Sequence, residues 1–529
     1  MPKRKKGSTT SLRPRFDLQE RLLGRFYEPL VLLYTLGRTR GEPAKPLIPS
    51  RKHLSYMPLT NLRRIFLNEL AYMCDYDKGG RTVTAIGLQC TPEKQIVWVA
   101  TNSGSTTKVI EFLASLLKQV MRTAMRAETG SFDTELASRC IHFATPRVKK
   151  YGSHLRPLIR RCVSHLLKTE PVVESGFIEW LQSWEYTRSP VDLCSSAYTS
   201  RKSNYMQVLA RLGAEPSYGS NEDSIYSAFA MVRHYIGRLG HHFRAAGTLI
   251  ACAPRLLDLF HNCEVRGVPV LPHATMPPPD QLTRPNNVVV RMLPANAPQL
   301  NHYQQALAVL DARFQVFHRF QENMATPSGN PCIHAEILVL EHFYRFGMRF
   351  VDDDSYIACS KPACFCCLLY FRHHPAHVIE PISHNKIYLN WRPPDFSTPM
   401  GNIGPHHQRD ILNTMNQVLR KEILLQLDAK TGHQAQHPDS VTGITISTQT
   451  GQAELHKEGA LFATRVADNN PGLDHFNQTS PGSIQDESRE VQPNNIELEA
   501  PNGEFFKFDD GLESPSSDSD EDGGVQLPV

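Results

Sequence analysis

The hydrophobic and polar positions between residues 57 and 104 follow two patterns in turn. From 59 to 76 apolar side chains recur every three or four positions, which predicts a helix with one buried face. Runs 83–88 and 96–100 are rich in β-branched residues, and a turn sequence over 91–94 separates them. Two such runs on either side of a turn predict a β-hairpin. This region therefore predicts a helix followed by two paired strands.

Residues 105–330 carry mostly helical spacing with few strand-like runs. Apolar residues recur at helical intervals over 108–126, 155–168, 224–260 and 302–320. A proline-rich stretch, 268–279, breaks this pattern before the last of these helices. The middle of the chain is therefore predicted to be helical.

The pattern changes again towards the end of the chain. One more helix is predicted over 409–427 and is expected to end at Gly432. From about 434 the sequence turns polar and acidic, and it includes the run Asp518-Ser519-Asp520-Glu521-Asp522. Such a composition cannot bury a core and predicts a disordered acidic tail.

The first of two motifs, Cys-Ile-His-Ala-Glu, occupies 332–336. Asn330 suits a helix cap and Pro331 suits the first helical position, so a helix is expected to begin here. Side chains two positions apart point about 200° apart on a helix, so His334 and Glu336 share a site only at a helix end. The sequence therefore predicts that both side chains project from the start of a helix.

The second motif, Cys-Phe-Cys-Cys, occupies 364–367. Residues 355–359 predict a buried strand, and Lys361-Pro362 is expected to begin a helix with the cysteines in its first turns. Amide groups at a helix start stabilise thiolates, which are the form of cysteine that binds metals. The Cys-x-x-Cys spacing alone is also compatible with a redox pair or with two buried apolar residues.

Together the two motifs supply three soft metal ligands and one carboxylate. His334, Cys364 and Cys367 would hold Zn²⁺, and the fourth position would be left for a water molecule. Glu336 would be the catalytic residue, taking the proton of that water and passing it to the reacting base. Cys359 and Cys366 are close enough in sequence to compete as ligands.

At these residues the chain resembles the cytidine deaminase-like superfamily, in particular its fungal branch of predicted nucleic-acid or nucleotide deaminases. The resemblance is carried by His334-Ala335-Glu336, by 358–367 and by 383–388. Pro362 lies two positions before Cys364, whereas the superfamily usually has proline immediately before the first cysteine. The resemblance implies an α/β fold with three layers, α-β-α, around a mixed sheet.

The resemblance also implies the domain plan. A helix and two strands should precede the His-x-Glu helix, and the best match is far upstream, so the deaminase-like domain is expected over 57–104 plus 331–395. The asparagine after the second strand, Asn102, would hold the substrate's sugar. Asparagine is also common in turns simply because it tolerates unusual backbone dihedrals. The remaining segments are a basic arm with a helix (1–56), the helical insertion (105–330), a C-terminal helix (396–433) and the tail (434–529).

The distribution of charge suggests a polyanionic partner. The formal net charge is only +4, from 57 basic and 53 acidic residues. The part from Gln434 onward holds 4 basic and 18 acidic residues, which leaves 53 basic and 35 acidic residues in the preceding part. A body this basic suits single-stranded DNA or RNA, although most single charge runs are solvated faces. A protein partner on the insertion or the tail is a further expectation.

The cysteine content and the apolar runs point to an intracellular protein. Twelve cysteines in 529 residues are too few for a secreted disulfide scaffold. No apolar run reaches the length of a membrane span, and the first residues lack the apolar core of a signal peptide. The basic run Pro2-Lys3-Arg4-Lys5-Lys6 resembles a nuclear import signal, so nucleus and cytoplasm both stay open.

Three functions fit this sequence. The first is a zinc-dependent hydrolytic deaminase of cytosine or adenine in nucleic acid, with a zinc-bound hydroxide as nucleophile. The second is the same reaction on a free nucleoside or nucleotide, which the length and the basic body disfavour. The third is a non-enzymatic nucleic-acid or protein-interaction module with a structural zinc, closed by a fourth ligand such as Cys359 or Cys366.

Overall fold

The computed structural model describes residues 17–37, 51–104, 106–126, 132–169, 174–186, 188–213, 225–260, 262–294, 296–325, 329–395 and 405–430. All of them belong to one compact unit. The predicted acidic tail, Gly432 and the basic run at 2–6 lie outside these residues. None of the described helices is long and apolar enough to cross a membrane.

One mixed sheet of four strands forms the centre of the fold. Its strands are β1 (Thr84–Cys90), β2 (Gln95–Thr101), β3 (Cys263–Gly267) and β4 (Ile357–Cys359). They are ordered β3-β2-β1-β4, with β1 antiparallel to both β2 and β4, and β2 parallel to β3. The predicted hairpin is confirmed by the β1–β2 pairing, in which Ala85 lies opposite Ala100.

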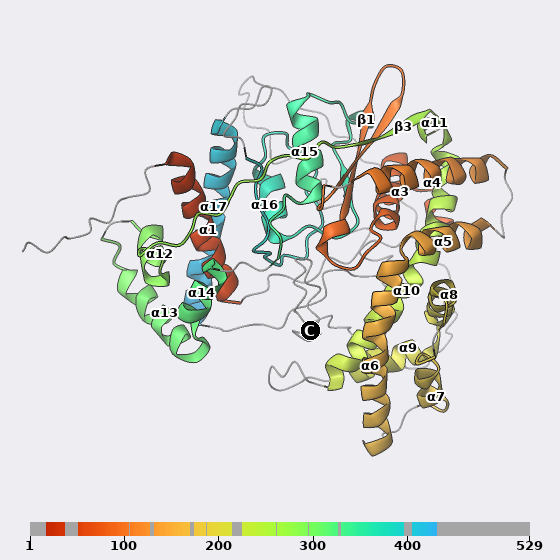
Figure 1. The fold of residues 1–529 in the computed structure, drawn as a ribbon, viewed down its shortest axis with the longest axis horizontal. Helices are drawn as coiled ribbons and strands as arrows, with labels where there is room; N and C mark the ends of the chain where they lie inside the picture. The colour runs from red at the N-terminus through yellow and green to blue at the C-terminus, as the bar shows by residue number, and fades with distance from the viewer. Residues whose placement is uncertain are drawn as a thin grey trace, which may run out of the picture. The chain divides into compact units, whose positions relative to one another are not determined.

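Helices cover both faces of this sheet. Alternate strand residues point to opposite faces, and Ala85 and Trp98 pack in one core with α15 (Ala335–Arg345) and α16 (Phe365–His373). Ile86 and Val97 pack in a second core with α3 (Leu59–Cys74) and α4 (Thr107–Arg126). Figure 1 shows these two helix pairs on opposite sides of β1. The fold is therefore the predicted α/β arrangement of three layers, α-β-α.

A glycine in β1 allows α15 to approach the sheet closely. A Cβ atom built on Gly87 would lie 2.7 Å from side-chain atoms of both Val339 and Phe343. Real Cβ contacts of that length essentially never occur, so any other residue here would push the helix away. Because the proposed metal ligand His334 is the N-cap of α15, the position of this helix also positions the site.

The predicted helical insertion contributes one strand as well as helices. β3 comes from this segment and pairs along its whole length with β2. The long helix α10 packs against α3 of the second core and against α5, α6, α8 and α9. The helices between α4 and β3 are α5 (Phe132–Phe143), α6 (Thr145–Thr169), α7 (Phe177–Gln182), α8 (Pro190–Ser200), α9 (Asn204–Gly213), α10 (Ile225–Cys252) and α11 (Leu257–Phe260).

A further group of helices covers the α15 side of the sheet. It joins the core of α15 and α16 and consists of α1 (Leu18–Thr35), α12 (Pro285–Met292), α13 (Leu300–Phe314), α14 (Val316–Ala325) and α17 (Pro405–Ala429). The single helix predicted over 302–320 is two helices, because Gln315 adopts a left-handed backbone (φ 51°) between them. The remaining helical segments are α2 (Arg51–Leu54) and the 3-10 turns Gly80–Thr82, Ala253–Arg255 and Val351–Asp353.

A buried ion pair joins the insertion to the sheet. Arg147, near the start of α6, donates to the backbone carbonyl of Asp75 at 2.7 Å and lies 3.5 Å from its carboxylate. Both side chains are almost completely buried. Asp75 also accepts hydrogen bonds from Thr82 (2.6 Å) and from Ser360 (3.4 Å), which precede β1 and follow β4. The helical insertion therefore holds the strand ends that border the site.

Replacing Arg147 by methionine is expected to lower the free energy of unfolding by about 3 kcal/mol or more, because it leaves the Asp75 carboxylate buried without its cation. Lys149→Met is the control. Because Lys149 is an exposed residue of the same helix, this substitution should change the free energy of unfolding by less than about 0.5 kcal/mol. Urea unfolding of both variants measures the difference. Equal stability of the two variants would contradict the structural role of the pair.

Candidate active site

His334 lies at the start of a helix, as the sequence predicts, but the helix begins later than expected. α15 starts at Ala335 with His334 as its N-cap in extended conformation, so Asn330 and Pro331 are not the cap and first residue. The reason is tertiary pairing: the Cys332 amide donates to the Asn390 carbonyl (3.0 Å), and the Cys332 carbonyl accepts from the Arg392 amide (2.9 Å). Held extended by this bridge, the chain turns helical only after His334.

The second motif shows the same shift. α16 begins at Phe365 with Cys364 as N-cap, and not at Lys361-Pro362 as predicted. Ala363 is held extended by a bridge to Ser383, with the Ala363 amide donating to the Ile382 carbonyl at 2.8 Å. The Cys364 sulfur accepts from the Cys367 amide at 3.4 Å, which caps the new helix. The N-cap residues of the two motif helices, His334 and Cys364, therefore lie close together.

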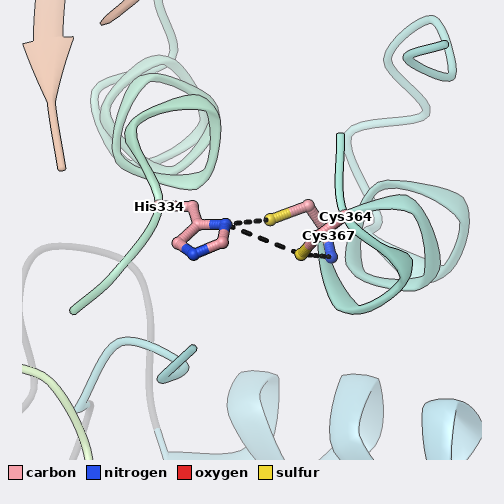
Figure 2. A group of neighbouring side chains, drawn as sticks. All are labelled: His334, Cys364 and Cys367. Carbon is pink, nitrogen blue, oxygen red and sulfur yellow. Dashed lines mark hydrogen bonds between the residues drawn. The ribbon is translucent and has the colours of Figure 1, made fainter. Parts of the chain in front are cut away.

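The three predicted ligands meet there. His334 Nδ1 lies 3.5 Å from Cys364 Sγ and 3.3 Å from Cys367 Sγ, and all three side chains are buried (Figure 2). Zinc–sulfur and zinc–nitrogen bonds of about 2.3 and 2.0 Å at a tetrahedral angle would separate N from S by about 3.5 Å. The spacing and the donor types therefore fit a tetrahedral metal such as zinc.

The electrostatics of the three donors agree with a cation site. Burial raises the pKa of the Cys364 thiol, but hydrogen bonds from Cys366 and Cys367 and the charge of His334 outweigh burial and hold it well below its usual range. Burial lowers the pKa of His334, but the Cys364 thiolate and the nearby thiols bring it well above its ordinary value. The site therefore stabilises a thiolate, which is the metal-binding form.

Neither of the two competing cysteines joins this group. Among the described residues, the donors that lie within 4.8 Å of one another at this site are those of His334, Cys364 and Cys367. The Cys359 sulfur instead lies 3.9 Å from the Glu336 carboxylate. Cys366 is buried in the same core and has a raised pKa, chiefly because of burial. Three donors from the described chain leave one tetrahedral position for another ligand.

Glu336 is a buried carboxylate beside the three donors. Its side chain lies in the first turn of α15 and is 4% exposed. Burial raises the pKa of Glu336 above its ordinary value, opposed by the charge of His334. A carboxyl group of raised pKa next to a metal site is suited to accept and return a proton near neutral pH.

The comparisons with known proteins bear on the same segment. Residues 333–395 match the family model of OTT_1508-like deaminases. This segment is therefore similar to deaminases of the cytidine deaminase-like type. No curated protein and no solved structure matches the chain. The match covers both motif helices, β4 and the segment that follows, whereas the upstream helix and hairpin lie outside it.

Asn102 lies next to the deaminase segment. Its Oδ1 accepts a hydrogen bond of 2.7 Å from the amide of Ala335, one of the amides left without a partner at the start of α15. Asn102 does not have the positive φ that would explain an asparagine in this turn. Asn102 is half-buried, and its Oδ1 holds the start of the helix.

One aromatic residue near the site, Tyr388, has its ring beside His334. The Tyr388 ring is half-buried, and its centroid is 6.2 Å from that of His334. Trp391 is completely buried against Phe26, and the Tyr356 hydroxyl is bonded to Asn68 on α3. Backbone hydrogen bonds between segments 382–386 and 363–365 bring Tyr388 close to His334. No local signal in the sequence indicates such pairing.

A second cluster has metal-ligand residue types but a different hydrogen-bond pattern. The Nε2 atoms of His374 and His407 lie 3.3 and 3.2 Å from Glu341 Oε1, and the Tyr370 hydroxyl donates to it at 2.5 Å. His374 Nδ1 accepts from the Ala376 amide (3.1 Å), so the proton of the neutral imidazole is on Nε2. A protonated Nε2 has no lone pair for a metal, so the tautomer of His374 argues against a metal at this cluster.

The Glu341→Gln variant is expected to lower the free energy of unfolding by about 2 kcal/mol at neutral pH, with zinc content unchanged. Burial raises the pKa of Glu341, but the contacts with His374 and His407 outweigh it and lower the value to about 2. Because the folded pKa is depressed, the stabilisation is present above the ordinary pKa of 4.5 and is lost as the pH falls through that of the folded state.

Urea unfolding of wild type and Glu341→Gln at neutral pH and at about pH 3 tests this, because the difference between the two proteins should shrink at the lower pH. Zinc analysis provides the second readout. Two zinc ions per wild-type chain, with one lost in the variant, would contradict the assignment and make this cluster a metal site.

Proposed function

We propose that this chain is a zinc-dependent hydrolytic deaminase that acts on cytosine or adenine bases in single-stranded nucleic acid. The observation that carries the proposal is the open set of three donors, His334, Cys364 and Cys367, with the buried Glu336 beside it. A structural zinc site is normally closed by four protein ligands and has no use for an extra carboxylate. The match of 333–395 to a deaminase family supports the same reaction class.

The chain's own residues would divide the reaction among them. His334, Cys364 and Cys367 would hold zinc, which when bound supplies a Lewis acid that lowers the pKa of a water to about 7. Glu336 would accept the proton of the attacking water and return it to the base. A carbon–oxygen bond forms at the ring carbon that carries the amine, the carbon–nitrogen bond breaks, and ammonia leaves.

Two residues would position the substrate. The Nδ2 of Asn102 would donate to the sugar, while its Oδ1 stays bonded to α15. Tyr388 would present its half-buried ring to the base near His334, since every base has a face that can stack on an aromatic side chain. Neither residue belongs to the donor group itself.

The basic residues favour nucleic acid over a free nucleotide as substrate. The chain before residue 434 has an excess of basic residues, which suits contacts with several phosphates in succession. A free nucleoside requires none of these contacts. An interaction module with a structural zinc is disfavoured because neither Cys359 nor Cys366 completes the donor group.

The test is direct assay of the zinc-loaded full chain on short single-stranded RNA and DNA and on free cytidine, adenosine and their nucleotides. Mass spectrometry of the digested products detects uracil from cytosine and hypoxanthine from adenine. Product that disappears when zinc is removed and returns when it is restored supports the proposal. Zinc-loaded, folded protein without activity on any of these substrates would favour the structural zinc.

A further inference from the structure

A basic surface runs along α6. This helix contains seven lysines and arginines and no aspartate or glutamate. Lys149, Arg156 and Arg160 follow one another at spacings of seven and four residues, so their directions differ by no more than about 40° around the helix axis. They extend over about 16 Å at 1.5 Å per residue. These three residues are called the α6 basic face.

Few carboxylates neutralise this face. Lys149 and Arg160 are exposed, and Arg156 is half-buried. Within the part of the chain that the structure describes, Arg160 pairs with Glu185 at 3.4 Å, and this pair is largely exposed. Lys149 and Arg156 have no carboxylate partner among the described residues. Exposed pairs contribute little, so the face keeps most of its positive charge.

The start of α6 touches the loop that leads to the active site. Lys150 Nζ lies 3.1 Å from the Asp77 carboxylate and donates to the Lys78 carbonyl at 3.4 Å. The other end of this loop accepts a hydrogen bond of 2.9 Å at the Arg81 carbonyl from Ser103, the residue after Asn102. The side chain of Arg81 is exposed. One ion pair and two hydrogen bonds therefore link the start of α6 to the turn of Asn102, beside which Arg81 is exposed.

We propose that the α6 basic face and Arg81 bind the phosphate backbone of the single-stranded nucleic acid whose base enters the active site. This inference rests on the proposed function, because it names the surface that holds the substrate. A row of separated cations suits a chain of phosphates better than a single anion, which would require convergent donors. The helical insertion is then part of the substrate-binding surface as well as a support for the sheet.

The test measures binding without turnover. Zinc-loaded full chain carrying Glu336→Gln is titrated into a fluorescein-labelled RNA or DNA strand of about 20 nucleotides at about 50 to 200 mM salt. Lys149→Gln, Arg156→Gln and Arg160→Gln are then combined in this background. The matched control combines Arg409→Gln, Lys421→Gln and Lys430→Gln, which remove two exposed cations from α17 and a third directly after its end.

The α6 triple variant is expected to bind about 10-fold more weakly or worse, and the slope of log affinity against log salt should decrease by about 2. The α17 control should bind as the parent does. Equal loss in both triples, or no loss in the α6 triple, overturns the proposed surface. If the parent binds neither strand, the surface is overturned as well. Deamination of free cytidine or adenosine by the wild type then shows whether the proposed chemistry stands without it.

Discussion

Zinc-loaded Glu336→Gln protein is expected to lose deaminase activity by about 10³-fold or more while keeping its fold and its zinc. Glutamine has nearly the same shape as glutamate but cannot accept the proton of the attacking water. The Glu336 side chain is buried beside the three donors and is not one of them. Proton transfer should therefore fail without loss of the metal.

Glu341→Gln is the matched control for this experiment. Glu341 lies on the same helix and is equally buried, but its carboxylate contacts Tyr370, His374 and His407 and not the donor group. Measured below its lowered unfolding temperature, this variant should retain activity within a few-fold of wild type. Glu336→Gln protein that keeps more than a tenth of the wild-type activity would exclude Glu336 as the proton acceptor.

Cys367→Ala is expected to weaken zinc binding by about 10³-fold, because it removes one of three protein ligands from a site whose binding energy is shared among them. Elemental analysis after dialysis should then find the variant nearly free of zinc. Activity should fall with the metal and should not return when zinc is supplied at a concentration that saturates the wild type.

Cys366→Ala is the control for the loss of a neighbouring thiol. Cys366 precedes Cys367 on α16 and is equally buried, but it lies outside the donor group. Its replacement removes packing and should leave the zinc affinity near that of wild type. The ligand assignment fails if Cys367→Ala keeps its full zinc content, or if Cys366→Ala loses zinc to the same extent.

The local pattern of the sequence was sufficient for the elements and for the chemistry of the ligands. Apolar spacing places a helix over 59–74 and a hairpin over 84–101 within two residues, because burial of one face imposes a period on the side chains. The grouping of His334, Cys364 and Cys367 was predictable because metal ligation requires these residue types at restricted spacings. These are properties of short segments, which their own residues determine.

The starts of the two motif helices depended on residues far along the chain. The capping signals at Asn330 and Lys361-Pro362 are sound locally, but bridges from Cys332 to Trp391 and from Ala363 to Ser383 keep both segments extended. A segment held extended by tertiary hydrogen bonds does not become the first turn of the helix, although its own residues favour a helix start. The shift makes His334 and Cys364 the caps that face each other.

The sequence by itself thus predicted a group of candidate residues that lie together in the structure, and the class of reaction that their chemistry suits. Only the tertiary structure decided how those residues meet: Asn102 bonds to the start of α15 across 233 positions, β3 joins the sheet from the insertion, and Arg147 secures Asp75. Such contacts join segments that are remote in sequence, and their energy depends on the burial and pairing of both partners at once. No pattern within either segment carries that information.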